Sequence, residues 1–211
     1  MPATPIPLDE LAARLSARFI HDAAGHASIL TTGLDVLALA DDEATRAEAA
    51  GLLKAGLSGL IARLDFYRQA FGRGEADVPT AELETRARGL FADVRPTLDW
   101  AVAAPALAAP IARAATILAQ IASEVLAVGG VARIAADGAG RHLSVVASGP
   151  RARLNAESRA GLLGEPAGGG PGGRWIQAFI LHAQIATAGG ALNITESEGE
   201  VIFDVSLPAA G

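Results

Sequence analysis

The chain has 211 residues, 23 acidic and 17 basic side chains, and a formal net charge of −6. This length allows two small domains with separate cores, and the acidic balance, with Lys54 as the single lysine, argues against binding to a nucleic-acid backbone. The sequence contains no cysteine, which excludes disulfides, thiolate metal sites and cysteine nucleophiles.

The amino-terminal residues lack the basic start and the apolar run of a signal peptide. No uncharged apolar stretch reaches the length needed to span a bilayer. Much of the hydrophobic content is alanine, which favours helices and buries little area. We therefore expect a soluble, cytoplasmic protein.

The first predicted helix runs from about Leu8 to Leu39. At about 100° per residue, one apolar stripe of this helix is expected to be buried. His26 falls on the stripe, which predicts a packed core histidine, whereas His21 points to the opposite, solvent-facing side. The stripe consists of Leu8, Ala12, Leu15, Phe19, Ala23, Leu30 and Leu37.

The immediate helical neighbours of His21 are Ala17, Arg18, Ala24 and Gly25. Three of these four residues are very small, so the imidazole is approachable by another molecule. A surface that only meets water more often carries lysine, glutamate or glutamine. The pattern allows either an ordinary surface histidine or one over which a partner docks.

The second predicted helix begins at Asp41-Asp42-Glu43, because acidic residues suit a helix N-terminus. Its apolar residues alternate steps of four and three, as in a coiled-coil seam, and its glycines Gly51, Gly56 and Gly59 allow close backbone approach. Two helices cannot enclose a core, so we expect two hairpins to form a four-helix bundle in a homodimer, unless the second domain covers the stripe. The seam consists of Leu53, Leu57, Leu60, Leu64, Tyr67 and Phe71.

The fold class predicted from these patterns is α+β, with residues 1–74 as a helical hairpin and residues 94–211 as an α/β sandwich whose helices cover one sheet face. Residues 75–93 form a linker with a short helix, Thr80–Ala92, capped by Thr80. The later expected elements, in chain order, are a strand 97–102, a helix 109–127, a strand hairpin 131–135 and 142–147, a short helix 157–163, a glycine-rich loop 164–173, a helix 175–187 and a strand hairpin 192–195 and 201–207.

This order of elements resembles the two-domain core of bacterial sensor histidine kinases, with His21-Asp22 in the place of the phosphorylated histidine and its acidic neighbour. The resemblance fails at the nucleotide site. Gln120 and Glu124 stand where these kinases carry an asparagine that helps to hold magnesium, and Ser148-Gly149-Pro150 replaces the start of the turn whose aspartate reads adenine. In the glycine-rich run 168–173, Pro171 removes an amide that a phosphate loop needs, so we interpret this run as a flexible loop.

A retained histidine beside an eroded nucleotide site is similar to the ChpT-type histidine phosphotransferases. Further resemblance comes from the strings Arg18-Phe19-Ile20-His21-Asp22, Gly149-Pro150-Arg151 and Trp175-Ile176-Gln177-Ala178. The resemblance implies a homodimer with one relay histidine per protomer. Its implied partners are receiver domains: a CckA-like hybrid histidine kinase as donor, and CtrA-like and single-domain receivers as recipients.

The resemblance implies phosphoryl transfer through His21, whose neutral imidazole can attack an aspartyl phosphate. Asp22 could orient or deprotonate the ring and Arg18 could neutralise phosphate charge, although either could simply solvate the helix. No cofactor or metal is expected on this chain, because the partner receiver supplies Mg²⁺. The expected partner-binding residues around His21 are Ala17, Ile20, Ala24, Gly25 and Ser28.

Two other functions stay open. The chain could be an active histidine kinase with atypical nucleotide contacts through Gln120 or Glu124, which predicts label taken directly from ATP. It could instead be a non-catalytic adaptor that binds receiver domains, in which case replacement of His21 would leave function intact.

Overall fold

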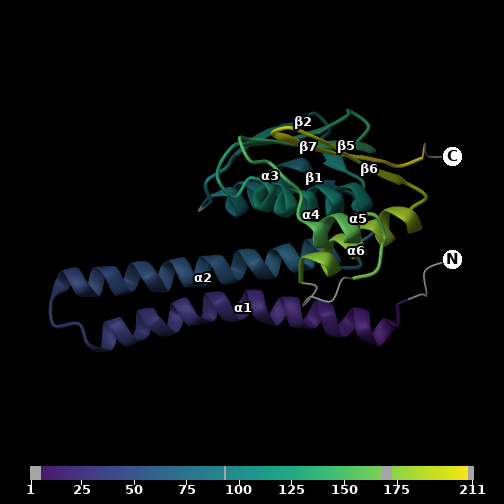
Figure 1. The fold of residues 1–211 in the computed structure, drawn as a ribbon. Helices are drawn as coiled ribbons and strands as arrows, with labels where there is room; N and C mark the ends of the chain where they lie inside the picture. The colour runs from purple at the N-terminus through teal and green to yellow at the C-terminus, as the bar shows by residue number, and fades with distance from the viewer. Residues whose placement is uncertain (1–5, 93, 168–172, 209–211) are drawn as a thin grey trace.

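The N-terminal part of the protein is a long antiparallel helical hairpin that lies beneath a layered α/β unit (Figure 1). The computed structural model describes residues 6–92, 94–167 and 173–208. Helix α1 spans Leu8–Ala38 and helix α2 spans Glu43–Phe71. Asp42 caps α2 by accepting a hydrogen bond from the Thr45 amide at 2.8 Å, as the acidic run predicts. Within the described ranges, no helix has the length and hydropathy of a membrane span.

Close approach of α1 and α2 depends on small residues. A Cβ atom at Gly56 would lie 2.9 Å from Leu30 Cγ, and one at Gly59 would lie 2.3 Å from His26 Nδ1. These two glycines therefore serve the contact between the helices, as expected. The prediction for Gly51 is wrong, because a Cβ there would meet no atom within 4 Å.

The apolar stripe of α1 is only partly covered in the single chain. Leu8 is 83% exposed and Leu37 is 41% exposed, and Gly33 is the buried residue of this helix. The seam of α2 is similarly open at Leu57 and Leu64. These positions are exposed in the single chain because the hairpin partner covers only one side of each helix, and the expected burial of them depends on a second hairpin.

The C-terminal unit contains a five-stranded sheet in the order β2-β4-β5-β7-β6, in which β2 and β4 are parallel and the other neighbours antiparallel. Buried and more exposed residues alternate along β4, β5 and β7, so one face of the sheet forms the core. The strands are β2 Thr97–Val102, β4 Val131–Ala136, β5 His142–Ser148, β6 Ala191–Ser197 and β7 Glu200–Ser206.

The helices of this unit lie between the sheet and the hairpin (Figure 1), as the α+β prediction requires. They are α3 Thr80–Phe91, α4 Ala109–Val125, α5 Ala156–Leu162 and α6 Gly173–Thr187. The segment read as a linker contributes β1, Val78–Pro79, which pairs with β3, Ala106–Leu107. The predicted capping role of Thr80 is wrong: Pro79 is the N-cap, and the Thr80 hydroxyl instead donates to the Ala104 carbonyl at 2.5 Å.

One buried cluster joins the two parts of the chain. Phe66 and Ala70 of α2 pack in the same apolar core as Leu118 of α4 and Val145 of β5. The second domain thus covers the C-terminal half of α2, while the loop end of the hairpin extends free of it (Figure 1). The end of α2 is therefore fixed against the sheet domain.

Candidate functional site

His21 lies on the exposed side of α1, and its side chain is 80% accessible to solvent. Its Nδ1 atom is 3.3 Å from Oδ1 of Asp22. Because a carboxylate only accepts hydrogen bonds, this contact assigns the ring proton to Nδ1. The other ring nitrogen, Nε2, then keeps its lone pair and can act as a nucleophile.

Three donor side chains contact the carboxylate of Asp22 on the side facing the protein interior. Its side chain is 7% exposed, and its Oδ2 atom accepts hydrogen bonds from Arg18 Nε and from the Tyr67 hydroxyl, each at 3.1 Å. Arg63 Nη1 lies 3.5 Å from the same oxygen. With Oδ2 occupied in this way, Oδ1 is left to face His21.

Tyr67 is positioned by aromatic packing and stays protonated. Its ring meets Phe19 edge to face at a centroid distance of 5.0 Å. Burial, and then the negative charge of Asp22, raise the pKa of Tyr67 to about 12. The phenol is thus a hydrogen-bond donor to Asp22 throughout the physiological range.

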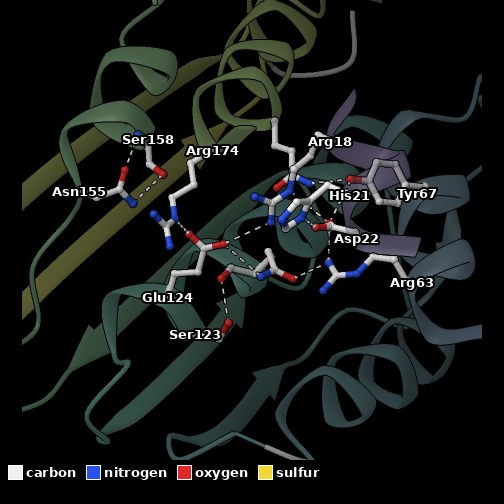
Figure 2. A network of polar contacts seen from close by, with 12 residues as sticks. Arg18, His21, Asp22, Arg63, Tyr67, Ser123, Glu124, Asn155, Ser158 and Arg174 are labelled. Carbon is white, nitrogen blue, oxygen red and sulfur yellow. Dashed lines mark hydrogen bonds and ion pairs between the residues drawn. The ribbon is translucent and has the colours of Figure 1, made fainter. Parts of the chain in front are cut away.

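The contacts of Asp22 continue into the C-terminal unit (Figure 2). Arg63 donates to Gln120 Oε1 at 3.0 Å, and Gln120 donates to Glu124 Oε1 at 3.2 Å. Glu124 also accepts from Arg174 of α6 at 2.8 Å. A single polar network therefore links α1, α2, α4 and α6 directly beneath His21.

The sequence-predicted site residues fall into two groups. Asp22 and Arg18 belong to the buried network, and Arg18 is not a free surface cation, since it also lies 3.9 Å from Glu124. The predicted partner-binding residues are all exposed on α1; they are Ala17, Ile20, Ala24, Gly25 and Ser28.

Two residues that contact Asp22 were not predicted as site residues. Arg63 and Tyr67 contact Asp22 from α2. Their signal in the sequence is weak: Tyr67 is a polar-tipped residue in an otherwise apolar seam, and Arg63 precedes Leu64 of the same seam. Gln177 of α6 supports Tyr67 by donating to its hydroxyl at 3.3 Å.

The residues at the nucleotide-site positions are engaged with other protein groups. Gln120 and Glu124 bind Arg63 and Arg174, and the Ser148 hydroxyl donates to Glu200 at 3.0 Å. In the described parts of the chain, no group of three His, Cys, Asp or Glu side chains could hold a metal ion. The glycine-rich run is outside the described residues, except for Gly173.

The C-terminal unit matches a known family model. The model of the histidine phosphotransferase C-terminal domain matches residues 80–200, which is more than half of the chain. The chain belongs to the histidine phosphotransferase family. The matched range does not include His21, so the family assignment rests on the C-terminal unit of this histidine phosphotransferase.

One solved structure supports this fold, and two others are weaker matches. A bacterial phosphotransferase superposes with a TM-score of 0.82 at 19% identity, covering 96% of this chain and 98% of that one. The histidine kinase AdeS of Acinetobacter baumannii gives a TM-score of 0.47 at 12% identity, with 89% and 96% covered. The histidine kinase domain of the blue-light activated kinase of Erythrobacter litoralis gives 0.46 at 14% identity, with 95% and 93% covered. No curated protein sequence matches this chain.

Proposed function

We propose that this protein is the histidine phosphotransferase of a bacterial two-component phosphorelay. His21 accepts a phosphoryl group from an aspartate of one receiver domain and passes it to response regulators, without taking phosphate from ATP. The observation that carries the proposal is the exposed His21 ring, whose Nδ1 is turned to Asp22 and whose Nε2 is left free.

The chemistry follows from this orientation. The Nε2 lone pair attacks the phosphorus of the receiver's aspartyl phosphate, the P–O bond to that carboxylate breaks, and the carboxylate leaves. Because Nδ1 keeps its proton, the phosphorylated ring is cationic, and the negative charge of Asp22 stabilises it. A cationic ring is also the better leaving group when a second receiver aspartate attacks.

The other residues of the network act as positioning residues for Asp22. Arg18, Arg63 and Tyr67 hold Oδ2, so that Oδ1 stays directed at His21. The charge of Arg18 is already matched by Asp22 and Glu124, which favours this role over direct neutralisation of phosphate. The receiver is expected to bring the Mg²⁺ that neutralises most of the phosphoryl charge.

Transfer from ATP is not expected, because the residues that would contact the adenine and the magnesium ion are either replaced or bound to other side chains. Ser148-Gly149-Pro150 provides no carboxylate for the adenine amino group. The two candidates for a magnesium-binding role, Gln120 and Glu124, are bound to arginines of neighbouring helices. Freeing either residue for a metal would break these contacts.

The surface around His21 is suited to close approach by a receiver domain. Gly25 lies one turn beyond His21, and a Cβ atom there would meet nothing within 4 Å. The chain's own packing therefore gives no reason for a glycine, which costs a helix roughly 1 kcal/mol relative to alanine. Exposed Ile20 would supply an apolar contact beside the histidine.

We further propose that the protein works as a cytoplasmic homodimer. Leu34 on α1 and Leu57, Ile61 and Leu64 on α2 are exposed apolar side chains. A second hairpin would bury them in a four-helix bundle and present one His21 per protomer. The proposed receivers belong to a CckA-like hybrid kinase, a CtrA-like regulator and a single-domain response regulator.

The direct test is phosphoryl transfer from a radiolabelled phosphorylated receiver domain to the whole 211-residue chain. Wild type should take up label, His21→Ala should take up none, and His142→Ala should match wild type because it removes a different exposed histidine. A parallel sample with labelled ATP alone should stay unlabelled.

Each other outcome selects a different function. Label taken from ATP would identify an active kinase, and no label from several receivers would favour an adaptor. Label on His21→Ala would place the phosphorylated residue elsewhere.

A second test addresses docking at Gly25. Gly25→Ala and Gly51→Ala both add a methyl group at a helix position with no neighbour within 4 Å, so both should raise thermal stability. Only Gly25→Ala should slow phosphoryl transfer from the receiver. Equal transfer rates in the two variants would remove Gly25 from the docking surface.

A further inference from the structure

Helix α6 of the C-terminal unit presents two glutamines to the end of α2. Gln177 is buried and donates from Nε2 to the Tyr67 hydroxyl at 3.3 Å, and Gln184 donates from Nε2 to the Ala70 carbonyl at 3.1 Å. The two glutamines are about two helical turns apart, so they lie on the same face of α6. Their targets differ, because Gln184 meets the main chain whereas Gln177 meets the side chain that donates to Asp22.

The bond from Gln177 fixes the direction in which the Tyr67 hydroxyl donates. An amide NH₂ group is a donor, so the phenol oxygen uses a lone pair to accept from Gln177. Its single proton is then free for Asp22, whose Oδ2 atom lies 3.1 Å away. Because Gln177 is 2% exposed, this contact is shielded from water. Gln177 thus acts on Asp22 through Tyr67.

A second contact reaches Asp22 from α4. Gln120 is also buried, and it accepts from Arg63 Nη1 at 3.0 Å through Oε1 while it donates to Glu124 through Nε2. The same Arg63 nitrogen lies 3.5 Å from Asp22 Oδ2. Gln120 therefore holds the guanidinium group at a place from which it reaches Asp22. Arg63 and Tyr67 both approach this carboxylate from α2 (Figure 2).

The two contacts meet at one oxygen of Asp22, and the other oxygen faces His21. Oδ1 lies 3.3 Å from Nδ1 of the ring. Hydrogen bonds in a shielded network polarise one another, so the loss of one member weakens its neighbours. The orientation of the His21 ring therefore depends on α4 and α6 as well as on its own helix.

We propose that Gln177 and Gln120 are positioning residues for phosphoryl transfer, through which the C-terminal unit keeps the ring proton of His21 on Nδ1. This inference rests on the proposed function, because it concerns the same transfer step. Nε2 forms the bond to phosphorus, and the receiver's carboxylate leaves with the electron pair of the broken P–O bond. The two glutamines keep Nε2 free of a proton for this attack. A unit whose nucleotide contacts are replaced thus keeps a part in the chemistry.

The first test locates the His21 proton by ¹⁵N NMR of the imidazole rings in the whole chain. The chain has four histidines, and the ring signals lost in His21→Ala identify those of His21. At a pH where the ring is neutral, wild type should show the tautomer with the proton on Nδ1. Gln177→Met and Gln120→Met remove the amide group at similar side-chain length, and each should increase the share of the tautomer protonated on Nε2.

The second test measures single-turnover phosphorylation of His21, once by phosphoramidate, which needs no receiver, and once by a phosphorylated receiver domain. Gln177→Met and Gln120→Met should each slow both reactions about three- to tenfold, as expected for the loss of one buried hydrogen bond. The receiver concentration that gives half the maximal rate should not change, because both glutamines are buried away from a docked receiver.

Two controls separate positioning from packing. Gln184→Met makes the same change on the same face of α6 and also breaks a bond to α2, so it should keep the wild-type tautomer and rates. Addition of Gln177→Met to Asp22→Ala should slow transfer no further, because Gln177 acts through that carboxylate.

Three results would overturn the inference. The first is a wild-type tautomer in both Gln177→Met and Gln120→Met. The second is equal slowing by Gln184→Met, which would reduce the effect to the docking of α6 on α2. The third is a further loss of rate when Gln177→Met is added to Asp22→Ala. A wild-type chain that takes no phosphate on His21 would instead refute the proposed function, and the tautomer comparison would still decide this inference.

Discussion

At the scale of single residues, Asp22 connects the exposed histidine to the interior. One of its oxygens faces His21, and the other is held by Arg18, Tyr67 and Arg63. A carboxylate shared in this way is poorly suited to remove a proton from the ring, since its charge is already matched by two arginines. Orientation of the ring is the role that the geometry favours.

Tyr67 offers a direct measure of this arrangement. It is the single tyrosine of the chain, so phenolate absorbance reports its titration alone. The midpoint should lie at about pH 12, above the ordinary value of 10.0, and Asp22→Asn should lower it. A wild-type midpoint near 10 would contradict the buried contact.

The same pKa shift predicts how stability changes in alkali. Between about pH 10 and about pH 12 the unfolded chain loses the Tyr67 proton while the folded chain keeps it. The free energy of unfolding should therefore fall as pH rises through this window. Tyr67→Phe should flatten that part of the curve in chemical denaturation experiments, and an unchanged slope would contradict the assignment.

The sequence predicts the exposure of His21 better than it predicts the side-chain contacts that hold Asp22. Exposure of His21 depends only on the geometry of its own helix, and the helical wheel gives it correctly. The contact between Asp22 and Tyr67 joins residues 45 positions apart and depends on how α1 and α2 align. Periodicity within one helix carries no information about that alignment.

At the scale of elements, α1 and α2 approach each other where glycines face large side chains. Gly33 faces Leu53 and Gly56 faces Leu30, so each helix supplies both a glycine and a leucine. This reciprocal packing fixes the alignment of the hairpin, and with it the distance between Asp22 and Tyr67. Gly51 takes no part in it.

Substitution of these glycines distinguishes the effect of helix propensity on the free energy of unfolding from the effect of packing between the helices. Gly51→Ala should raise the free energy of unfolding by about 0.5–1 kcal/mol, because alanine favours the helix and meets no neighbour. Gly56→Ala should lower it by about 1–3 kcal/mol, because the new Cβ would lie 2.9 Å from Leu30 Cγ. Denaturant unfolding measures both, and stabilisation by Gly56→Ala would contradict the packing described.

Element type and order were predictable, while short pairings were not. Strand β2 has the predicted bounds, because a run bounded by turn residues reads clearly as a strand. The pairing of β1 with β3 involves two residues on each side and has no periodicity to detect. Thr80 follows Pro79 and looks like a cap, but its hydroxyl is used by the Ala104 carbonyl.

At the scale of the whole molecule, the hairpin leaves apolar side chains of α2 exposed in the single chain. Leu57 is half exposed, as are Ile61 and Leu64 within the next two turns of α2. Exposed apolar stripes of this kind mark association surfaces. They are the surface that the proposed homodimer would bury.

A charge at this surface should dissociate the dimer. Leu57→Glu is expected to shift the molar mass measured by light scattering from two chains to one, because an unpaired charge would be buried in the bundle. Leu163→Glu, at an exposed apolar position after α5, should leave the mass unchanged. A monomeric wild type would contradict the bundle.

The apolar core described above has no boundary between the hairpin and the sheet domain. Phe66 and Ala70 belong to the same cluster as Leu118 and Val145. Heat should therefore melt both parts in one cooperative transition, with equal calorimetric and van't Hoff enthalpies at a fixed protein concentration. A fragment limited to residues 80–200 would lose the α2 side chains that cover α4 and should bind hydrophobic dyes. The stretch matched by the family model is thus shorter than the expected unit of folding, which is the whole chain.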